Sequence, residues 1–235
     1  EHDGAYIAIN SWGDGWGENG IFYISYEDAL VETSLEGISN ASTNINDTLE
    51  QVQFEDENLY NEMKKFLDRK IISYDDNTKT IFTSKLTLEG IYSLNLSNKN
   101  ISNLKGIEKF TKLFYIQLND NKIENIECLS GFHNDYMTIN LANNNIKDVS
   151  ALSNITQIDI SGNPIETGID KLEKVGELNL DRCNLNDSQL EQIASLSNLR
   201  GITLSNNNIQ DVSCLKNLEL VTLDLSGNKE IEGLE

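Results

Sequence analysis

The sequence predicts an α/β protein in which short parallel strands stack, repeat upon repeat, into one sheet. A stretch of the form Leu-Ser-Asn-Asn-Asn-Ile, at residues 204–209, recurs upstream at a nearly fixed period between residues 91 and 235. Aliphatic residues fall at the same positions in each copy. Each copy is too short to bury a core alone, so neighbouring copies must share one. These observations favour a solenoid.

Composition limits the function. The chain has 235 residues, enough to bury a sizeable core. With 38 acidic and 18 basic residues its formal net charge is −20, which repels phosphate backbones and anionic membrane surfaces. We therefore expect no nucleic-acid partner. No apolar run reaches the ~18 residues needed to cross a bilayer, so no membrane insertion is predicted.

The repeats share a register. Positions 4, 6 and 11 are aliphatic almost throughout, as at Ile202, Leu204 and Ile209. This spacing resembles the leucine-rich repeat, Leu-x-x-Leu-x-Leu-x-x-Asn-x-Leu. The resemblance implies a right-handed leucine-rich-repeat solenoid with a parallel β-sheet on its concave face, one strand per repeat at positions 3–5. We place position 1 at Ile91, Leu113, Tyr136, Ile155, Val175, Leu199 and Leu220.

Several polar and small residues take their meaning from this register. The asparagine position, where the amide should satisfy backbone groups inside the turn, holds Asn121, Asn144, Asn163, Asn207 and Asn228. Lys99 and Cys183 replace it in the first and fifth repeats, and Lys99 suggests a turn open to solvent. Cys128 and Cys214 fall in a slot that takes small residues, so we expect buried thiols. Three scattered cysteines predict neither a disulfide framework nor a metal site, and no cofactor is expected.

The segments outside the strands differ between repeats. Most are short and suit 3₁₀ turns, whereas residues 187–196 of the fifth repeat predict a helix. The seventh repeat ends without a polar closing segment. We expect the parent chain to continue there, or a neighbouring molecule to cover this end.

Residues 51–90 predict a helical N-terminal cap for the repeats. Leu59, Met63, Phe66 and Leu67 fall on one face of a helix. The helix start at residues 56–59 and the first repeat at 94–107 resemble internalin-like leucine-rich-repeat proteins. A cap is needed because an open repeat end exposes core leucines. Residues 34–50, rich in Ser, Asn, Thr and Asp, predict a linker. The turn at 75–78 lacks the Gly and Glu of a calcium loop, which favours a solvated turn.

Residues 1–33 predict a β-hairpin, with strands near 4–10 and 21–26 joined by a glycine-rich loop. The motif Asn10-Ser-Trp-Gly13, followed by Trp16-Gly17, resembles the C-terminal end of papain-like cysteine peptidases. That resemblance assigns Asn10 to orienting the catalytic histidine and Trp12 to shielding it.

The rest of that catalytic apparatus is not in this sequence. In papain-like peptidases the nucleophile and the base precede this motif. No cysteine lies upstream here, and the upstream histidine, His2, is too close to Asn10 to match. Asn10 and Trp12 are thus predicted to be vestigial, and this chain to be inactive, because a thiolate–imidazolium pair needs both partners. A peptidase remnant and an ordinary hairpin both remain open, and we expect the hairpin to dock on the repeats or on another copy.

The concave face is the predicted binding surface. Tyr92, Phe114, Tyr115 and Met137 are adjacent in the register and should form an apolar cluster near the cap. Packing of these side chains on each other or on the cap is the alternative to partner binding. The predicted ligand-binding residues are Tyr92, Phe114, Tyr115, Gln117, Met137, Asn140, Gln157, Asp159, Glu177, Arg182 and Arg200.

Three functions are compatible with these observations. The chain is a recognition module that binds a protein or a surface glycan, or the C-terminal part of a secreted papain-like cysteine peptidase whose repeats target its substrate, or a structural spacer. Both family resemblances imply a secreted or cell-surface bacterial protein. Self-association through the hairpin or the open last repeat is a further expectation. Fold analogy does not supply the ligand.

Overall fold

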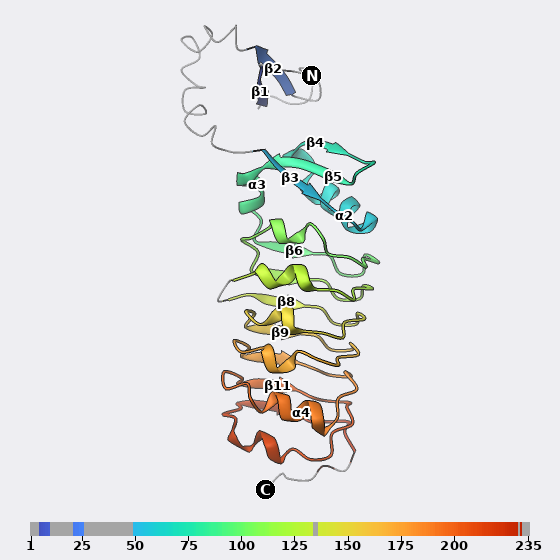
Figure 1. Cartoon of the computed structure of the whole chain (residues 1–235), viewed down its shortest axis with the longest axis vertical. Coiled ribbons are helices and arrows are strands. Elements are labelled where there is room, and N and C mark those ends of the chain that lie inside the picture. Colours follow the sequence, from blue (N-terminus) through green and yellow to red (C-terminus); the bar gives the residue numbers. More distant parts are fainter. Residues whose placement is uncertain (1–4, 10–20, 26–48, 134–135, 230, 232–235) are drawn as a thin grey trace. The chain divides into compact units, whose positions relative to one another are not determined.

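The computed structural model describes the backbone of residues 5–9 and 21–25, together with residues 49–133, 136–229 and 231 (Figure 1). The chain divides into two compact units, Glu1–Thr48 and Leu49–Glu235. Within the described residues, no helix is both long enough and apolar enough to cross a membrane.

The first unit contains two paired strands. Strand β1 (Ala5–Ile9) runs antiparallel to β2 (Ile21–Ser25), with Ile9 opposite Ile21. Alternating β-branched and aromatic residues favour this pairing. Residues 10–20 lie outside the described part of the chain, and Asn10 and Trp12 lie among them, so their vestigial role stays a prediction.

The second unit opens with a mixed α/β segment, residues 49–90, which we call the N-terminal segment. Its strands β3 (Leu49–Gln53), β4 (Ile71–Asp75) and β5 (Thr80–Ser84) form an antiparallel sheet in the order β3-β5-β4. Helix α2 (Glu57–Leu67), the 3₁₀ turn η2 (Asp68–Lys70) and the short helix α3 (Lys85–Glu89) complete it. The segment therefore combines the predicted helix with three strands, and β3 begins inside the stretch assigned to a linker.

Helix α2 forms where the amphipathic pattern predicts it. It begins after Asp56, whose Oδ1 accepts a hydrogen bond from Leu59 N at 2.9 Å, as an N-cap residue does. Leu59, Met63 and Leu67 are buried, but Phe66 is 48% exposed. The prediction that Phe66 faces the core is wrong. Tyr60, which precedes Met63 by three positions, fills the core-facing stripe instead.

The repeats build a seven-stranded parallel sheet with its strands in sequence order (Figure 1). Each strand occupies positions 3–5 of its repeat, as predicted, and consecutive strands pair position for position, so that Leu94 lies opposite Ile116 and Leu178 opposite Ile202. The strands are β6 (Ser93–Asn95), β7 (Tyr115–Gln117), β8 (Thr138–Asn140), β9 (Gln157–Asp159), β10 (Glu177–Asn179), β11 (Gly201–Thr203) and β12 (Thr222–Asp224).

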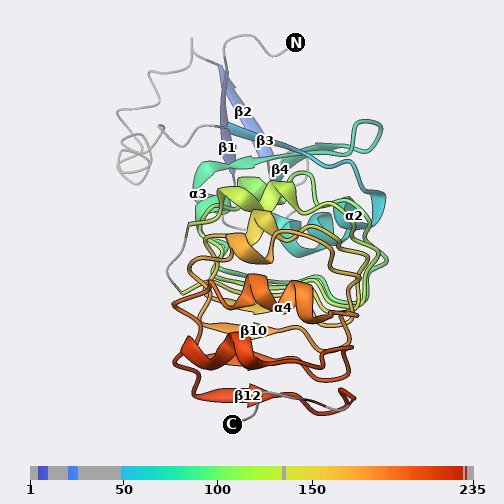
Figure 2. The ribbon, with the colours of Figure 1, turned by 60° about the horizontal axis from the view of Figure 1, so that its bottom comes forward.

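Short helical segments stack along the other side of the repeats (Figure 2). The fifth repeat holds an α-helix, α4 (Asp187–Ile193), which begins at a capping box of Asn186 and Gln189. This confirms both the predicted helix and the predicted 3₁₀ turns. The 3₁₀ segments are η3 (Ile107–Lys109), η4 (Glu127–Gly131), η5 (Ser150–Leu152), η6 (Ile169–Lys171) and η7 (Ser213–Asn217).

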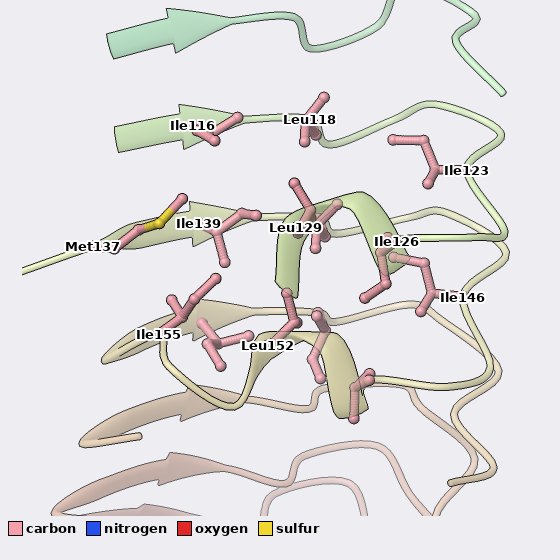
Figure 3. Packing of buried hydrophobic residues seen from close by; sticks show 14 of the residues in the cluster. Ile116, Leu118, Ile123, Ile126, Leu129, Met137, Ile139, Ile146, Leu152 and Ile155 are labelled. Carbon is pink, nitrogen blue, oxygen red and sulfur yellow. The ribbon is translucent and has the colours of Figure 1, made fainter. Parts of the chain in front are cut away.

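The core lies between the sheet and these helical segments. Ile116 and Ile139 of adjacent strands point the same way, and Leu129 and Leu152 meet them from η4 and η5 (Figure 3). All four side chains are essentially inaccessible to solvent. A single continuous cluster of buried residues extends from Val52 in β3 to Leu215 in η7, so the N-terminal segment and the repeats share one core.

In the third repeat the strand lies where predicted, but a different residue fills the core position before it. Met137 is fully buried, whereas Tyr136, placed by the sequence at the core position, is 84% exposed. Both residues precede β8 and both are large enough for the core slot. Burial favours the thioether, which is apolar and flexible, over a phenol whose hydroxyl needs a partner. Met137 therefore belongs to the core and not to the predicted binding surface.

The asparagine row binds each turn to the previous one. Asn163 is typical, because its Oδ1 accepts from Ile146 N at 3.0 Å and its Nδ2 donates to Leu141 O and Ile160 O at 2.9 Å. Asn121, Asn144, Asn207 and Asn228 make equivalent bonds. This confirms that the amides satisfy backbone groups inside the turns.

Two repeats depart from the row, each with its own solution. Cys183 donates weakly from Sγ to Ile160 O at 3.3 Å, while Ile165 N turns to Asn163 O of its own repeat. Lys99, predicted in a turn open to solvent, is partly exposed and pairs through Nζ with Glu62 of α2 at 2.9 Å. The lysine therefore connects the first repeat to the N-terminal segment.

The open face of the repeat sheet

The sheet has one buried and one exposed side. Successive side chains in a strand point to opposite faces, and position 4 of β6–β11 is buried in every repeat. Positions 3 and 5 therefore form the opposite surface, which we call the open sheet face. Of the predicted ligand-binding residues, it carries Tyr115, Gln117, Asn140, Gln157, Asp159 and Glu177, on β7–β10.

Three aromatic side chains gather where the sheet begins. Tyr92 and Phe114 hold position 2 of the first two repeats, and their ring centroids lie 6.3 Å apart at an interplanar angle of 37°. Tyr115 follows Phe114 in β7, and its hydroxyl accepts a hydrogen bond from Gln117 Nε2 at 2.7 Å. We call Tyr92, Phe114 and Tyr115 the aromatic cluster. They remain 54%, 44% and 37% exposed, so packing on one another covers only part of their surface.

Most position-5 side chains also have a structural task. Asn140 Oδ1 accepts from Ala142 N at 3.0 Å, and Asp159 Oδ1 accepts from Ser161 N at 3.1 Å and from Ser161 Oγ at 2.8 Å. Asn95, Asn179 and Asp224 make the same turn in their repeats. Such Asx turns fix the chain as it leaves the strand. One side-chain oxygen of each of these residues is therefore already hydrogen-bonded and is less available to a ligand.

A shallow hollow of about 270 Å³ lies along the centre of this face, between β7 and β12. Gly201 of β11 lines it, at a position that carries a side chain in every other repeat. Gly201 is not among the predicted ligand-binding residues, although a glycine inside a strand is a signal of close approach by another group. The polar side chains around it belong to Tyr115, Thr138, Asn140, Gln157, Asp159, Glu177, Asn179, Thr203 and Thr222.

The two predicted arginines lie outside the hollow. Arg182 pairs with Asp181 at 2.9 Å, and its φ of 53° is left-handed at a place where the other repeats have Asn, Asp or Gly. Arg200 donates from Nη1 to Ser197 O and Leu199 O at 2.9 Å and lies 3.5 Å from Glu219. Both guanidinium groups thus bind nearby residues of the same chain and do not line the hollow.

Neither the cysteines nor the acidic turn shows features of a reactive or metal-binding site. Desolvation raises the pKa of Cys128 to about 12 and that of Cys183 to about 11, which disfavours the thiolate. Asp75 accepts hydrogen bonds from Asn77 N and Thr78 Oγ1, both at 2.9 Å. Among the described residues, no group of three His, Cys, Asp or Glu side chains is placed to hold a metal ion.

Solved structures share this arrangement of repeats. An internalin (InlF) from Listeria monocytogenes is 25% identical over 76% of this chain and 58% of its own, with a TM-score of 0.57. The fold is leucine-rich-repeat-like. The TLR13–ssRNA13 complex matches 64% of this chain and 25% of its own at 22% identity and a TM-score of 0.50, and internalin C2 from Listeria monocytogenes matches 75% of this chain and 66% of its own at 24% identity and 0.49.

These comparisons establish the leucine-rich-repeat-like fold and no function. No protein-family model matches the sequence, and no curated protein matches it. The chain spans little more than half the length of the first internalin. Nothing in the comparisons supports the resemblance of residues 1–33 to a papain-like peptidase.

Proposed function

We propose that this chain is a recognition module that binds a partner protein on the open sheet face and has no catalytic activity of its own. One observation carries the proposal. The aromatic cluster presents three large side chains, 54%, 44% and 37% exposed, where the sheet begins: Tyr115 is the first residue of β7, and Tyr92 and Phe114 directly precede β6 and β7. Exposed aromatic groups of this kind favour protein contact, because Tyr and Phe bury a large area when a partner covers them.

Rigidity supports the same proposal. Tyr115 belongs to β7, which pairs with a strand on each side, and Phe114 N bonds to Tyr92 O at 3.0 Å. A side chain on a fixed backbone loses little freedom when a partner binds, so less of the contact energy is spent on ordering. Asn140 and Asp159, which help to form the turns, then add polar contacts at the rim.

Other ligand classes fit less well. The net charge of −20 opposes nucleic acid, although the TLR13 structure is of a complex with RNA. Aromatic rings also stack on sugars, so a surface glycan is the alternative outcome of the test. A secreted or cell-surface location, self-association through the hairpin or the last repeat, and an origin as the C-terminal part of a secreted papain-like peptidase stay predictions from the sequence.

Selection from a random peptide library displayed on phage tests the proposal on the whole chain. Peptides enriched on the wild-type chain are measured against a Phe114→Ala, Tyr115→Ala variant. We expect affinity to fall at least about tenfold, or ~1.4 kcal/mol, as loss of an interface anchor requires. Phe66→Ala is the matched control, because Phe66 is equally exposed but lies on α2.

The result depends on which substitution weakens binding of the enriched peptides. Enriched peptides that bind the double variant as well as wild type, or that lose binding only with Phe66→Ala, would show that the aromatic cluster is not the recognition surface. Binding of an immobilised glycan that is abolished by the same double variant would replace the protein partner with a carbohydrate.

A further inference from the structure

In the hollow on the open sheet face, the Glu177 carboxylate leans over Gly201, because the glycine has no side chain to exclude it. Gly201 pairs with Glu177 of β10 on one side and with Thr222 of β12 on the other. A methyl group added at Gly201 would overlap the Glu177 carboxylate and would lie 2.6 Å from Thr222 Oγ1. A carboxylate and a hydroxyl therefore converge on the space above the glycine.

The charge of the hollow has one sign. Its charged lining residues are Asp159 and Glu177, and its other polar side chains are neutral amides and hydroxyls. In the described part of the chain, Glu177 makes no ion pair and its side chain makes no hydrogen bond. One Asp159 oxygen accepts hydrogen bonds from Ser161, and these bonds do not neutralise the negative charge of the carboxylate.

Nearby cations do not neutralise this site. Arg182 is paired with Asp181, and Arg200 is turned toward backbone carbonyls and Glu219. The whole chain also carries 38 acidic against 18 basic residues, which steers positively charged partners toward it. Charge complementarity thus calls for a basic group from outside the chain.

We propose that the hollow receives a lysine or arginine side chain of the partner protein, an inference that rests on the proposed function. The cationic head pairs with the Glu177 carboxylate where this group leans over Gly201, beside Thr222 Oγ1, and Asp159 of β9 adds negative charge to the lining of the same hollow. The aromatic cluster and the hollow share Tyr115 at their boundary, so one basic, aromatic-contacting segment of the partner spans both.

A pair of peptide probes tests the charge requirement. The ¹⁵N-labelled chain is titrated with acetyl-Gly-Arg-Gly-amide and with the same peptide carrying citrulline, which keeps the shape of arginine without its charge. We expect the arginine peptide to shift the amide signals of Gly201, Glu177 and Thr222 and to bind at least about fivefold more tightly than the citrulline peptide. Equal binding of both peptides would overturn the proposal.

Two substitutions locate the effect. Glu177→Gln removes the charge at almost constant size and should weaken the arginine peptide about fivefold. Gly201→Ala should reduce binding because its methyl group would displace the Glu177 carboxylate from above residue 201. A thermal melt shows whether that variant still folds. Glu191→Gln is the control, because this exposed glutamate lies on α4 among the helical segments. An unchanged response with Glu177→Gln would also overturn the proposal.

The two proposals can fail separately. If library peptides depend on Phe114 and Tyr115 while the arginine and citrulline peptides bind alike, the recognition surface stands and the basic partner does not. If the arginine peptide responds to Glu177→Gln while no library peptide depends on the aromatic cluster, the hollow binds a cation, but the proposed recognition function fails.

Discussion

At the scale of single residues, buried amides hold the repeats in register. Asn163 is 1% exposed and satisfies backbone groups of two consecutive repeats at once. Within the described residues no buried side-chain nitrogen or oxygen lacks a hydrogen-bond partner. Because an unpaired buried polar group costs free energy, loss of this amide would leave Ile146 N without its partner and Leu141 O with the Asn144 amide as its remaining side-chain donor.

Replacing Asn163 tests this account. Asn163→Ala should lower the free energy of unfolding by about 2–4 kcal/mol, since it removes several hydrogen bonds and leaves the buried N–H of Ile146 unpaired. Urea denaturation followed by circular dichroism measures the loss. Asn145→Ala is the matched control, because Asn145 is exposed, and should change stability by less than ~0.5 kcal/mol. Similar values for both variants would mean that the row does not stabilise the stack.

At the scale of elements, the joint between α2 and the first repeat is built from polar groups. Asp56 caps α2 through Leu59 N, and its second oxygen accepts from Ser102 N and Ser102 Oγ, each at 2.8 Å. On the next turns of the helix, Asn58 donates to Asn100 O at 2.9 Å and Glu62 pairs with Lys99 at 2.9 Å. Asp56 thus caps α2 and also connects this helix to the first repeat by hydrogen bonds.

The protonation of Asp56 should therefore appear in the stability of the whole unit. Burial alone raises its pKa, but the hydrogen bonds from Leu59, Ser102 and Asn103 outweigh this and lower it below 3.8. A carboxyl whose folded pKa is lowered stabilises the fold above its unfolded pKa. That contribution is lost as pH falls through the folded pKa. We expect Asp56→Asn to cost about 2 kcal/mol at pH 7.

The pH dependence separates this effect from a general loss of packing. The gap between wild type and Asp56→Asn should shrink as pH falls below about 4, because protonated Asp56 resembles Asn. Urea unfolding at pH 7, 4 and 3 measures the gap. Glu124→Gln, at an exposed carboxyl, is the control and should follow wild type at each pH. A gap that stays constant from pH 7 to pH 3 would contradict the assignment.

The same elements show what the sequence can predict. Repeat periodicity places every strand of the seven-stranded sheet, because each copy repeats the same pattern of buried and exposed positions. It fails before β8, where Tyr136 and Met137 compete for one core slot and neighbouring side chains decide the outcome. Helical spacing likewise cannot choose between Tyr60 and Phe66. The hollow over Gly201 depends on how Glu177 and Thr222 lean across strands, which no pattern within one repeat encodes.

At the scale of the whole molecule, negative charge is in large excess over positive charge. Half of the 18 lysines and arginines, all of them in the described residues, form ion pairs, such as Lys147–Glu166 at 2.7 Å and Lys64–Asp76 at 2.7 Å. A net charge of −20 remains. Exposed pairs of this kind each contribute little, whereas the surplus of like charge acts against the compact state as a whole. Repulsion should therefore outweigh the pairs in the response to salt.

Salt should stabilise this protein. The screening length falls from about 10 Å at 0.1 M salt to about 3 Å at 1 M, so repulsion among the carboxylates weakens and Tm should rise by several degrees. Differential scanning calorimetry in NaCl and KCl measures this rise, which should be equal for both salts because screening does not depend on the identity of the cation. Calcium chloride at matched ionic strength is the control for a specific cation site. It should raise Tm no further than NaCl, since the Asp75 oxygens at the acidic turn already accept hydrogen bonds. A larger rise with calcium would place a cation site on this chain, and a fall of Tm with salt would show that the ion pairs, not the surplus charge, dominate its electrostatics.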